Sequence, residues 1–194
     1  MKTALYFGSF NPIHNGHLHV ARQALEQQQL YELWLVVSPQ NPFKENSELA
    51  SEEHRLHMAQ LACANENHIR ICDIEFSLPR PSFTIDTVRE LIEINPNRAF
   101  QLIIGEDNLP EFNRWKEFEA LLNLVDLLVY PRTNTTHTIP DFLEPFKKRI
   151  QFLNGDLVNI SATDIRGKVH HEESITGLTH PMVIEYIEKN KLYS

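Results

Sequence analysis

Short runs of apolar residues alternate along this chain with longer stretches in which apolar residues recur at every third or fourth position. The short runs predict strands buried on both faces, and the wider spacing predicts amphipathic helices. The predicted strands are residues 3–7, 33–38, 69–74, 100–104, 126–130 and 149–153. Apolar strands separated by helices indicate the doubly wound α/β class, with a mostly parallel Rossmann-like sheet and helices on both faces.

Four apolar stripes mark the predicted helices. They are Leu18, Ala21 and Leu25; Leu56, Ala59 and Cys63; Val88, Leu91 and Ile92; and Val183, Ile184 and Ile187. Two long polar stretches, 38–48 and 131–140, each follow a predicted strand, so we expect mobile loops on the side where this fold binds ligands. The length of 194 residues predicts one domain, residues 1–194.

Composition narrows the class of protein. A hydrophobic fraction of 42% with 23% charged residues is typical of a soluble globular chain. Cys63 and Cys72 have no metal or redox spacing and are expected to be reduced thiols. The start "KTALYF" is too short for a signal peptide and no run is long enough for a membrane span, so we expect a cytoplasmic protein with no membrane partner.

The net charge of −8 argues against nucleic acid as the partner. A phosphate ligand would therefore need a local basic pocket. The oligomeric state stays open, and a homo-oligomer is compatible with the sequence.

The stretch "FGSFNPIHNGHLHV" joins the first predicted strand to the first predicted helix. Gly8 permits a sharp turn and close approach of a ligand, and Gly16 removes a side chain at the helix start, whose free N–H groups favour an anion. His14 and His17 are three residues apart, so they converge on one point once the first helical turn forms. The junction is suited to binding the phosphates of a nucleotide.

Two other interpretations apply to these histidines. They are ordinary surface or core residues, or they bind zinc together with His19. No cysteine or carboxylate lies nearby at a matching spacing, which makes zinc the weaker alternative.

A second candidate phosphate site is "NISATDIRG" at residues 159–167. Ser161 and Thr163 precede a helix-compatible segment, and Asp164 completes a weak capping box with Ser161. Arg166 adds a permanently charged donor suited to phosphate. Taken alone, the stretch is equally consistent with a plain helix cap.

Together the two stretches resemble the nucleotidylyltransferase superfamily. His14-Asn15-Gly16-His17 is similar to its HxGH signature, and "ISATDIR" is similar to its ISSTxIR motif, with Ala162 in place of the usual second serine. Three further stretches resemble bacterial nicotinate-nucleotide adenylyltransferases: residues 38–46, 80–91 and 103–122. The motifs occur in family order and cover most of the chain. Two residues depart from the family pattern: Phe43 stands where a histidine is common, and Lys116 stands where a tyrosine is usual.

The resemblance implies transfer of an adenylyl group from ATP to nicotinate mononucleotide, with Mg²⁺ accompanying ATP. The implied catalytic residues are His14, His17, Lys44 and Arg166. The implied ATP-binding residues are Gly8, Ser9, Phe10, His14, Gly16, His17, Gly105, Asp107, Arg132, Ile160, Ser161, Thr163 and Arg166. The implied residues for nicotinate mononucleotide are Phe83, Thr84, Trp115 and Lys116.

The residues themselves agree with this assignment. Trp115 lies in a polar stretch, and its indole suits stacking on a positively charged pyridinium ring, although it equally suits a hydrophobic anchor. Asp107 follows an apolar strand. Two interpretations apply to its carboxylate: it accepts a hydrogen bond from a ribose hydroxyl or an adenine amine, or it caps the next helix. We expect Lys44 and Arg132 in the two long loops on the ligand side.

Three alternatives remain at this point. Phosphopantetheine adenylyltransferase shares the HxGH and serine-rich motifs, but it does not explain Trp115 or residues 82–87. The second is an enzyme that prefers nicotinamide mononucleotide, whose ring carries an amide where that of nicotinate mononucleotide carries a carboxylate. A nucleotide-binding regulator without activity would have the same pocket.

Overall fold

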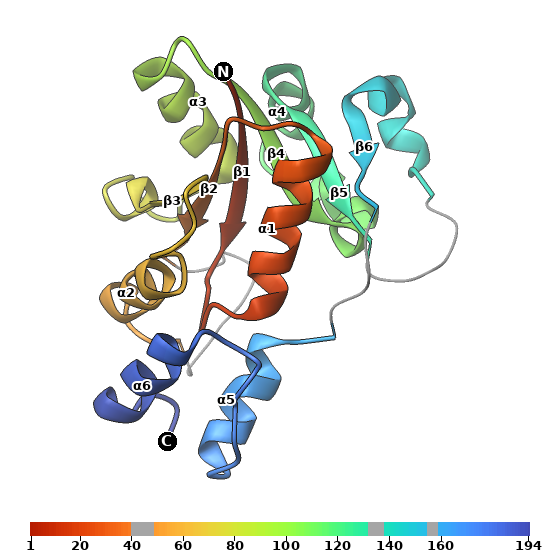
Figure 1. The fold of residues 1–194 in the computed structure, drawn as a ribbon. Helices are drawn as coiled ribbons and strands as arrows, with labels where there is room; N and C mark the ends of the chain where they lie inside the picture. Colours follow the sequence, from red (N-terminus) through yellow and green to blue (C-terminus); the bar gives the residue numbers. More distant parts are fainter. Residues whose placement is uncertain (40–48, 132–137, 155–158) are drawn as a thin grey trace.

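The computed structural model describes residues 1–39, 49–131, 138–154 and 159–194. Its centre is a six-stranded sheet, seen in Figure 1, in which all neighbouring strands are parallel. The strands are β1 (Lys2–Gly8), β2 (Glu32–Val37), β3 (Ile69–Cys72), β4 (Ala99–Gly105), β5 (Asp126–Tyr130) and β6 (Ile150–Phe152). Their order is β3-β2-β1-β4-β5-β6. The predicted doubly wound parallel sheet is confirmed.

Each predicted strand is found, with one end clearly different. The prediction extended the third strand to residue 74, whereas β3 ends at Cys72 and a 3₁₀ turn, η1 (Ile74–Phe76), follows. The chain turns there because the carbonyl of Asp73 accepts the N–H of Phe76 at 2.9 Å. The turn brings Glu75 into the interior, where it is 2% exposed.

The helices fill the connections between the strands. They are α1 (Asn15–Gln27), α2 (Glu52–Ala62), α3 (Thr84–Ile94), α4 (Phe118–Leu124), α5 (Ala162–His170) and α6 (Pro181–Asn190). Two longer 3₁₀ segments, η2 (Glu106–Arg114) and η3 (Asp141–Arg149), flank β4 and β6. No helix in these described ranges is long and apolar enough to cross a membrane.

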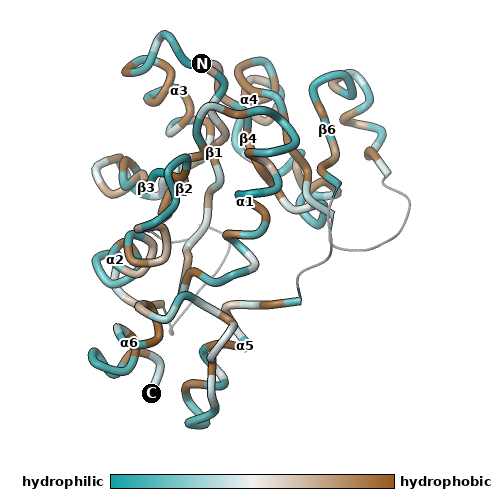
Figure 2. Tube along the Cα trace, in the orientation of Figure 1, coloured by the Kyte–Doolittle hydropathy of each residue, from teal (hydrophilic) through white to brown (hydrophobic). Residues whose placement is uncertain are grey.

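The two faces of the sheet carry separate hydrophobic cores. Successive side chains of a strand point to opposite faces. In β1, Ala4 and Tyr6 therefore join a core with residues of α1, α2, α5 and α6, whereas Leu5 joins a core with residues of α3 and α4. Figure 2 shows hydrophobic and hydrophilic residues alternating along these helices, as expected for elements with one buried side.

The buried stripe of α2 differs from the prediction. Its buried residues are Arg55, Met58, Ala59 and Ala62, while Leu56 is only partly buried. Cys63 is buried just beyond the end of the helix, and both it and Cys72 are free thiols, as expected. The stripe is offset by one residue because an arginine occupies an interior position.

The strand order reverses direction between β1 and β4. Connections leave these neighbouring strands toward opposite edges of the sheet, which opens a crevice beyond their carboxyl ends. Figure 1 shows α5 and α6 at this end of the sheet, beyond the tip of β1. Gly8 and Gly105 are the last residues of the two strands.

Candidate functional site

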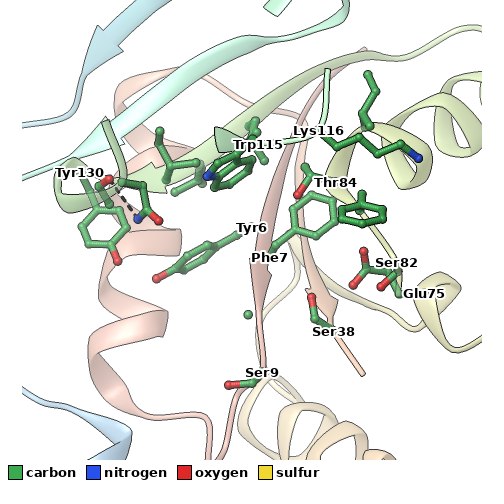
Figure 3. Close-up of a pocket in the computed structure, with 18 of the residues that line it drawn as sticks. Tyr6, Phe7, Ser9, Ser38, Glu75, Ser82, Thr84, Trp115, Lys116 and Tyr130 are labelled. Carbon is green, nitrogen blue, oxygen red and sulfur yellow. Dashed lines mark hydrogen bonds between the residues drawn. The ribbon is translucent and has the colours of Figure 1, made fainter. Parts of the chain in front are cut away.

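A cavity of about 260 Å³ lies at the carboxyl ends of the central strands. Of the residues that we predicted for the site, it is lined by Gly8, Ser9, Phe83, Thr84, Gly105, Trp115 and Lys116. Figure 3 shows Trp115, Thr84 and Lys116 around one part of the cavity and Ser9 at the end of β1. Gly8, Ser9 and Gly105 come from the predicted ATP-binding set, whereas the lining does not include His14, His17, Ser161, Thr163 or Arg166.

The turn after β1 is made differently from the prediction. We expected Gly8 to provide the unusual backbone conformation, but the left-handed residue is Phe10, at φ 46°. Gly8 is needed for space, because a Cβ there would lie 2.9 Å from the Phe10 ring. The Phe10 ring is 1% exposed, so at the site this residue offers its backbone.

His14 and His17 come together at the start of α1. Their rings stack with centroids 3.6 Å apart and an interplanar angle of 28°. The backbone N–H of His14 donates to Nδ1 of His17 at 3.2 Å, so the neutral His17 ring carries its proton on Nε2. His14 is 7% exposed, and His17 is half-buried against Phe10. The expected convergence of the two rings is found.

The start of α1 is less open than a bare helix end. The N–H of Asn15 donates to the carbonyl of Leu178 at 2.9 Å, and the hydroxyl of Thr179 donates to the carbonyl of Ile13 at 2.8 Å. The segment before α6 therefore fixes the first helical turn. Gly16 is buried in that turn, where a side chain would have to be accommodated.

The start of α5 faces the same loop. Ser161 is the N-cap, and its Oγ accepts the backbone N–H of Asp164 at 3.1 Å, which confirms the predicted capping. Thr163, which we placed before the helix, lies in its first turn. Arg166 donates from Nη1 to the carbonyl of Asn11 at 3.0 Å. Ile160 packs against the core on the α1 side of the sheet.

The other part of the cavity contains the predicted aromatic platform. Trp115 is half-buried and stacks on Phe112, with ring centroids 4.8 Å apart. One face of the indole is thus anchored to the core, while the residue also lines the cavity. The anchoring and the ligand-facing interpretations of Trp115 are compatible.

Thr84 is the first residue of α3, so the amide-rich start of this helix lies at the cavity. The side chain of Lys116 contacts this helix start: its Nζ lies 4.8 Å from the centre of the Phe83 ring and 2.8 Å from Asp86 Oδ2. The lysine that replaces the usual tyrosine therefore joins α3 to the end of η2.

Gly105 and Asp107 lie at the end of β4. A Cβ on Gly105 would lie 2.2 Å from Asp107 Oδ1 and 3.1 Å from the hydroxyl oxygen of Tyr130, so the glycine makes room for both side chains. Asn108 Nδ2 donates to the carbonyl of Gly105 at 3.3 Å. Asp107 belongs to the first turn of η2, for which no side-chain cap is seen.

Two predicted residues, Lys44 and Arg132, lie outside the described residues, as do most of the two long loops that carry them. Several residues at the site were missed; among them are Glu75, which lines the cavity together with the unpredicted Ser38, Ser82 and Tyr130, and Arg55, which binds the carbonyl of the lining residue Ser9. A signal existed for Arg55, because positions 55, 58, 59 and 62 form one helical stripe with an arginine in it. Nothing local in the sequence marked Glu75.

Among the residues that the structure describes, no group of three or more His, Cys, Asp or Glu side chains is arranged to hold a metal ion. The zinc alternative for His14, His17 and His19 therefore has no support among the described residues.

Comparison with known proteins connects this geometry to a family. The cytidylyltransferase-like family model matches residues 5–168. A probable nicotinate-nucleotide adenylyltransferase of Cytophaga hutchinsonii is 46% identical, covering 100% of this chain and 99% of that protein. One from Flavobacterium johnsoniae is 41% identical, with 100% and 99% covered.

A solved structure has the same fold. It is the nicotinic acid mononucleotide adenylyltransferase of Plasmodium falciparum complexed with NaAD, at a TM-score of 0.79 and 23% identity, covering 99% of this chain and 97% of that one. The full-length similarity, the matching fold and the paired histidines at the switch point agree. The chain belongs to the nicotinate-nucleotide adenylyltransferase family of cytidylyltransferase-like proteins.

Proposed function

We propose that this chain transfers the adenylyl group of ATP to nicotinate mononucleotide. A phosphate oxygen of the acceptor attacks the α-phosphorus in line, the bond from that phosphorus to the bridging oxygen breaks, and pyrophosphate leaves as nicotinate adenine dinucleotide forms. The attacking oxygen is already anionic, so no protein nucleophile and no strong base are needed. Positioning and charge stabilisation supply the catalysis.

The observation that carries this proposal is the adjacency of two different subsites. The paired rings of His14 and His17 follow the β1–α1 loop, and Arg166 of α5 donates a hydrogen bond to Asn11 in the same loop. That loop begins at Ser9, which also lines the cavity containing Trp115 and Thr84. A phosphate-binding region therefore borders a cavity with an aromatic wall.

On the donor side, the triphosphate lies between the starts of α1 and α5, where helix dipoles favour anions. His17 donates from Nε2 to an oxygen of the α-phosphate, since its Nδ1 already accepts from His14. His14, Ser161, Thr163 and Arg166 bind the remaining phosphates. Lys44 and Arg132 are assigned to the phosphates on their sequence resemblance.

The rest of the nucleotide occupies the ends of β1 and β4. The backbones of Gly8, Ser9, Phe10, Gly16 and Ile160 approach it, and Gly105 and Asp107 bind its sugar or base.

On the acceptor side, the nicotinate ring stacks on Trp115. Its carboxylate accepts hydrogen bonds from backbone N–H groups near Thr84 and Lys116, with Phe83 beside it. The start of α3 favours a carboxylate over a neutral amide because the helix dipole adds attraction for the negative charge only. This supports nicotinate over nicotinamide mononucleotide.

Mg²⁺ accompanies ATP in this proposal. It binds oxygen ligands, largely from the triphosphate and water, and it neutralises part of the phosphate charge. Such a metal needs few protein ligands. This agrees with the donor set at the described site, where hydroxyl, imidazole and guanidinium groups outnumber carboxylates.

Pyrophosphate release measured with ATP and three acceptors tests the function. We expect the highest kcat/KM with nicotinate mononucleotide. A higher value with nicotinamide mononucleotide or phosphopantetheine would overturn the acceptor assignment. ATP binding without turnover of any acceptor would support the regulator alternative instead.

The His17→Ala variant tests the assigned role of the histidine. Removing a donor aimed at the transition state should lower kcat by roughly 10²-fold or more and leave KM for nicotinate mononucleotide little changed. The His19→Ala variant, on the same helix, is the control and should retain activity. An unchanged kcat with only a raised KM would contradict a transition-state role for His17.

A further inference from the structure

Arg55 is a fully buried charge at the back of the proposed nucleotide site. It is 0% exposed and is the largest fully buried side chain in the described part of the protein. Burial lowers the pKa of its guanidinium, and nearby Glu52 opposes this effect. An arginine nevertheless stays protonated, so its donors need acceptors in the interior.

The acceptors of Arg55 are backbone carbonyls. Nε donates to Ala50 at 2.9 Å, Nη1 donates to Ser9 at 2.7 Å and to Ser38 at 2.6 Å, and Nη2 donates to Pro39 at 2.6 Å. No carboxylate among the described residues forms an ion pair with it. The guanidinium is therefore bound entirely by main-chain oxygens.

These carbonyls come from three separate parts of the chain. Ser9 begins the β1–α1 loop, Ser38 and Pro39 follow β2, and Ala50 precedes α2. Ser9 and Ser38 also line the cavity, and both are labelled in Figure 3. One buried side chain thus connects the backbones on which the cavity and the phosphate-binding loop are built.

Asn11 extends this connection to the second phosphate motif. Its Oδ1 accepts the N–H of Ala50 at 3.1 Å and the hydroxyl of Tyr193 at 2.7 Å, while its carbonyl accepts Arg166 Nη1 at 3.0 Å. Ala50 is therefore shared: its carbonyl binds Arg55 and its N–H binds the loop residue Asn11. A shift of Arg55 would be transmitted to the loop that precedes His14.

We propose that Arg55 is a positioning residue for adenylyl transfer: it holds the β1–α1 loop against the ends of β2 and α2, so that His14 and His17 meet the triphosphate. The inference about ATP rests on the proposed function, whereas the inference about the loop does not. A planar fork with several donors suits separated carbonyls, and the compact ammonium of lysine does not reproduce it.

The test compares Arg55→Ala and Arg55→Lys with a matched control, Met58→Ala. Met58 is 0% exposed on the same helix, so its truncation destabilises α2 without removing the carbonyl contacts. For each variant we would measure amide hydrogen exchange of residues 9–17, ATP affinity by calorimetry, steady-state kinetics, and rescue by free guanidinium ion.

We expect faster exchange at residues 9–17 in both Arg55 variants than in Met58→Ala. A displaced loop should cost roughly 10²-fold in kcat, the scale typical of a misplacement of about 1 Å, with KM for nicotinate mononucleotide little changed. ATP affinity should fall as well. Guanidinium should restore part of the activity of Arg55→Ala and none in the control.

Three results would overturn the inference. They are loop exchange equal to that of Met58→Ala, an equal loss of ATP affinity in the control, and wild-type kcat in Arg55→Lys. If Arg55→Ala fails to fold, Arg55→Lys carries the same comparison. A wild-type protein that releases no pyrophosphate would refute the proposed function alone, because the exchange rates still decide whether Arg55 holds the loop.

Discussion

Glu75 is a carboxyl group in an interior position, facing the cavity from the turn after β3. Its Oε1 accepts the hydroxyl of Thr87 at 2.7 Å. Burial raises the pKa of Glu75, and the hydroxyls of Ser38, Thr87 and Ser82 oppose the rise. The side chain therefore binds a proton more readily in the folded protein than in the unfolded chain.

This proton linkage predicts a pH dependence of stability. Between the ordinary pKa of 4.5 and the raised folded value, the folded state binds more protons. The contribution of Glu75 is therefore fully favourable below the lower pKa and is lost as pH rises through the higher one. The Glu75→Gln variant cannot ionise at this position, so it should not show this loss. The difference in free energy of unfolding, variant minus wild type, should therefore increase as pH increases.

Urea unfolding of both proteins from pH 5 to pH 8 measures the difference. Other titrating groups are common to the two proteins and cancel to first order. A constant offset between the two curves would show that Glu75 does not titrate with a raised pKa.

At the scale of elements, the proposed site uses the starts of three helices. α1, α3 and α5 begin at Asn15, Thr84 and Ala162, and each has a different residue before it. Ser161 before α5 caps with its side chain, whereas Phe83 before α3 makes no side-chain cap. The first turn of α3 is held instead by the ion pair between Asp86 and Lys116 and by the hydrogen bond from Thr87 to Glu75.

The cap of α5 gives a prediction for this helix alone. Ser161→Ala removes the oxygen that accepts from Asp164, so it should destabilise α5 by about 1 kcal/mol, while Ser161→Asn should retain most of the stability. Amide hydrogen exchange within residues 162–170 measures the effect. Equal exchange in Ser161→Ala and Ser161→Asn would show that the cap contributes nothing.

At the scale of the whole molecule, a cluster of ion pairs around the buried Glu32 lies at the end of the sheet opposite the cavity. The cavity lies at the carboxyl ends of the strands, whereas Glu32 begins β2 at the amino end. Glu32 is 5% exposed and forms ion pairs of 2.9 Å with Arg70 and with Arg98, and it accepts the indole N–H of Trp34 at 2.9 Å. This cluster joins β2 to β3 and to the loop before β4.

Glu32→Gln should therefore lower stability without lowering activity. Loss of hydrogen bonds to a charged group costs roughly 1.5–3 kcal/mol, and each kcal/mol lowers Tm by about 2–4 °C in a chain of this size. Calorimetry measures the Tm, and pyrophosphate release at 25 °C checks that kcat/KM is retained. A variant with the wild-type Tm but reduced kcat/KM would contradict this separation.

The pattern of apolar and polar residues was enough to predict the parallel sheet, because strand and helix periods are local properties of the chain. The convergence of His14 and His17 and the Ser161 cap were predictable for the same reason: each depends on residues a few positions apart. Membership of the family followed from the order of these motifs along the chain.

The tertiary structure alone decided which groups the buried charges bind. Arg55 reaches carbonyls 46, 17, 16 and 5 positions away in the sequence, and Asn11 binds Tyr193 from 182 positions away. Such contacts exist only once the sheet has brought the carboxyl ends of its strands together. The local sequence specified the groups that we propose for phosphate and pyridine recognition, and long-range packing determined how they are held.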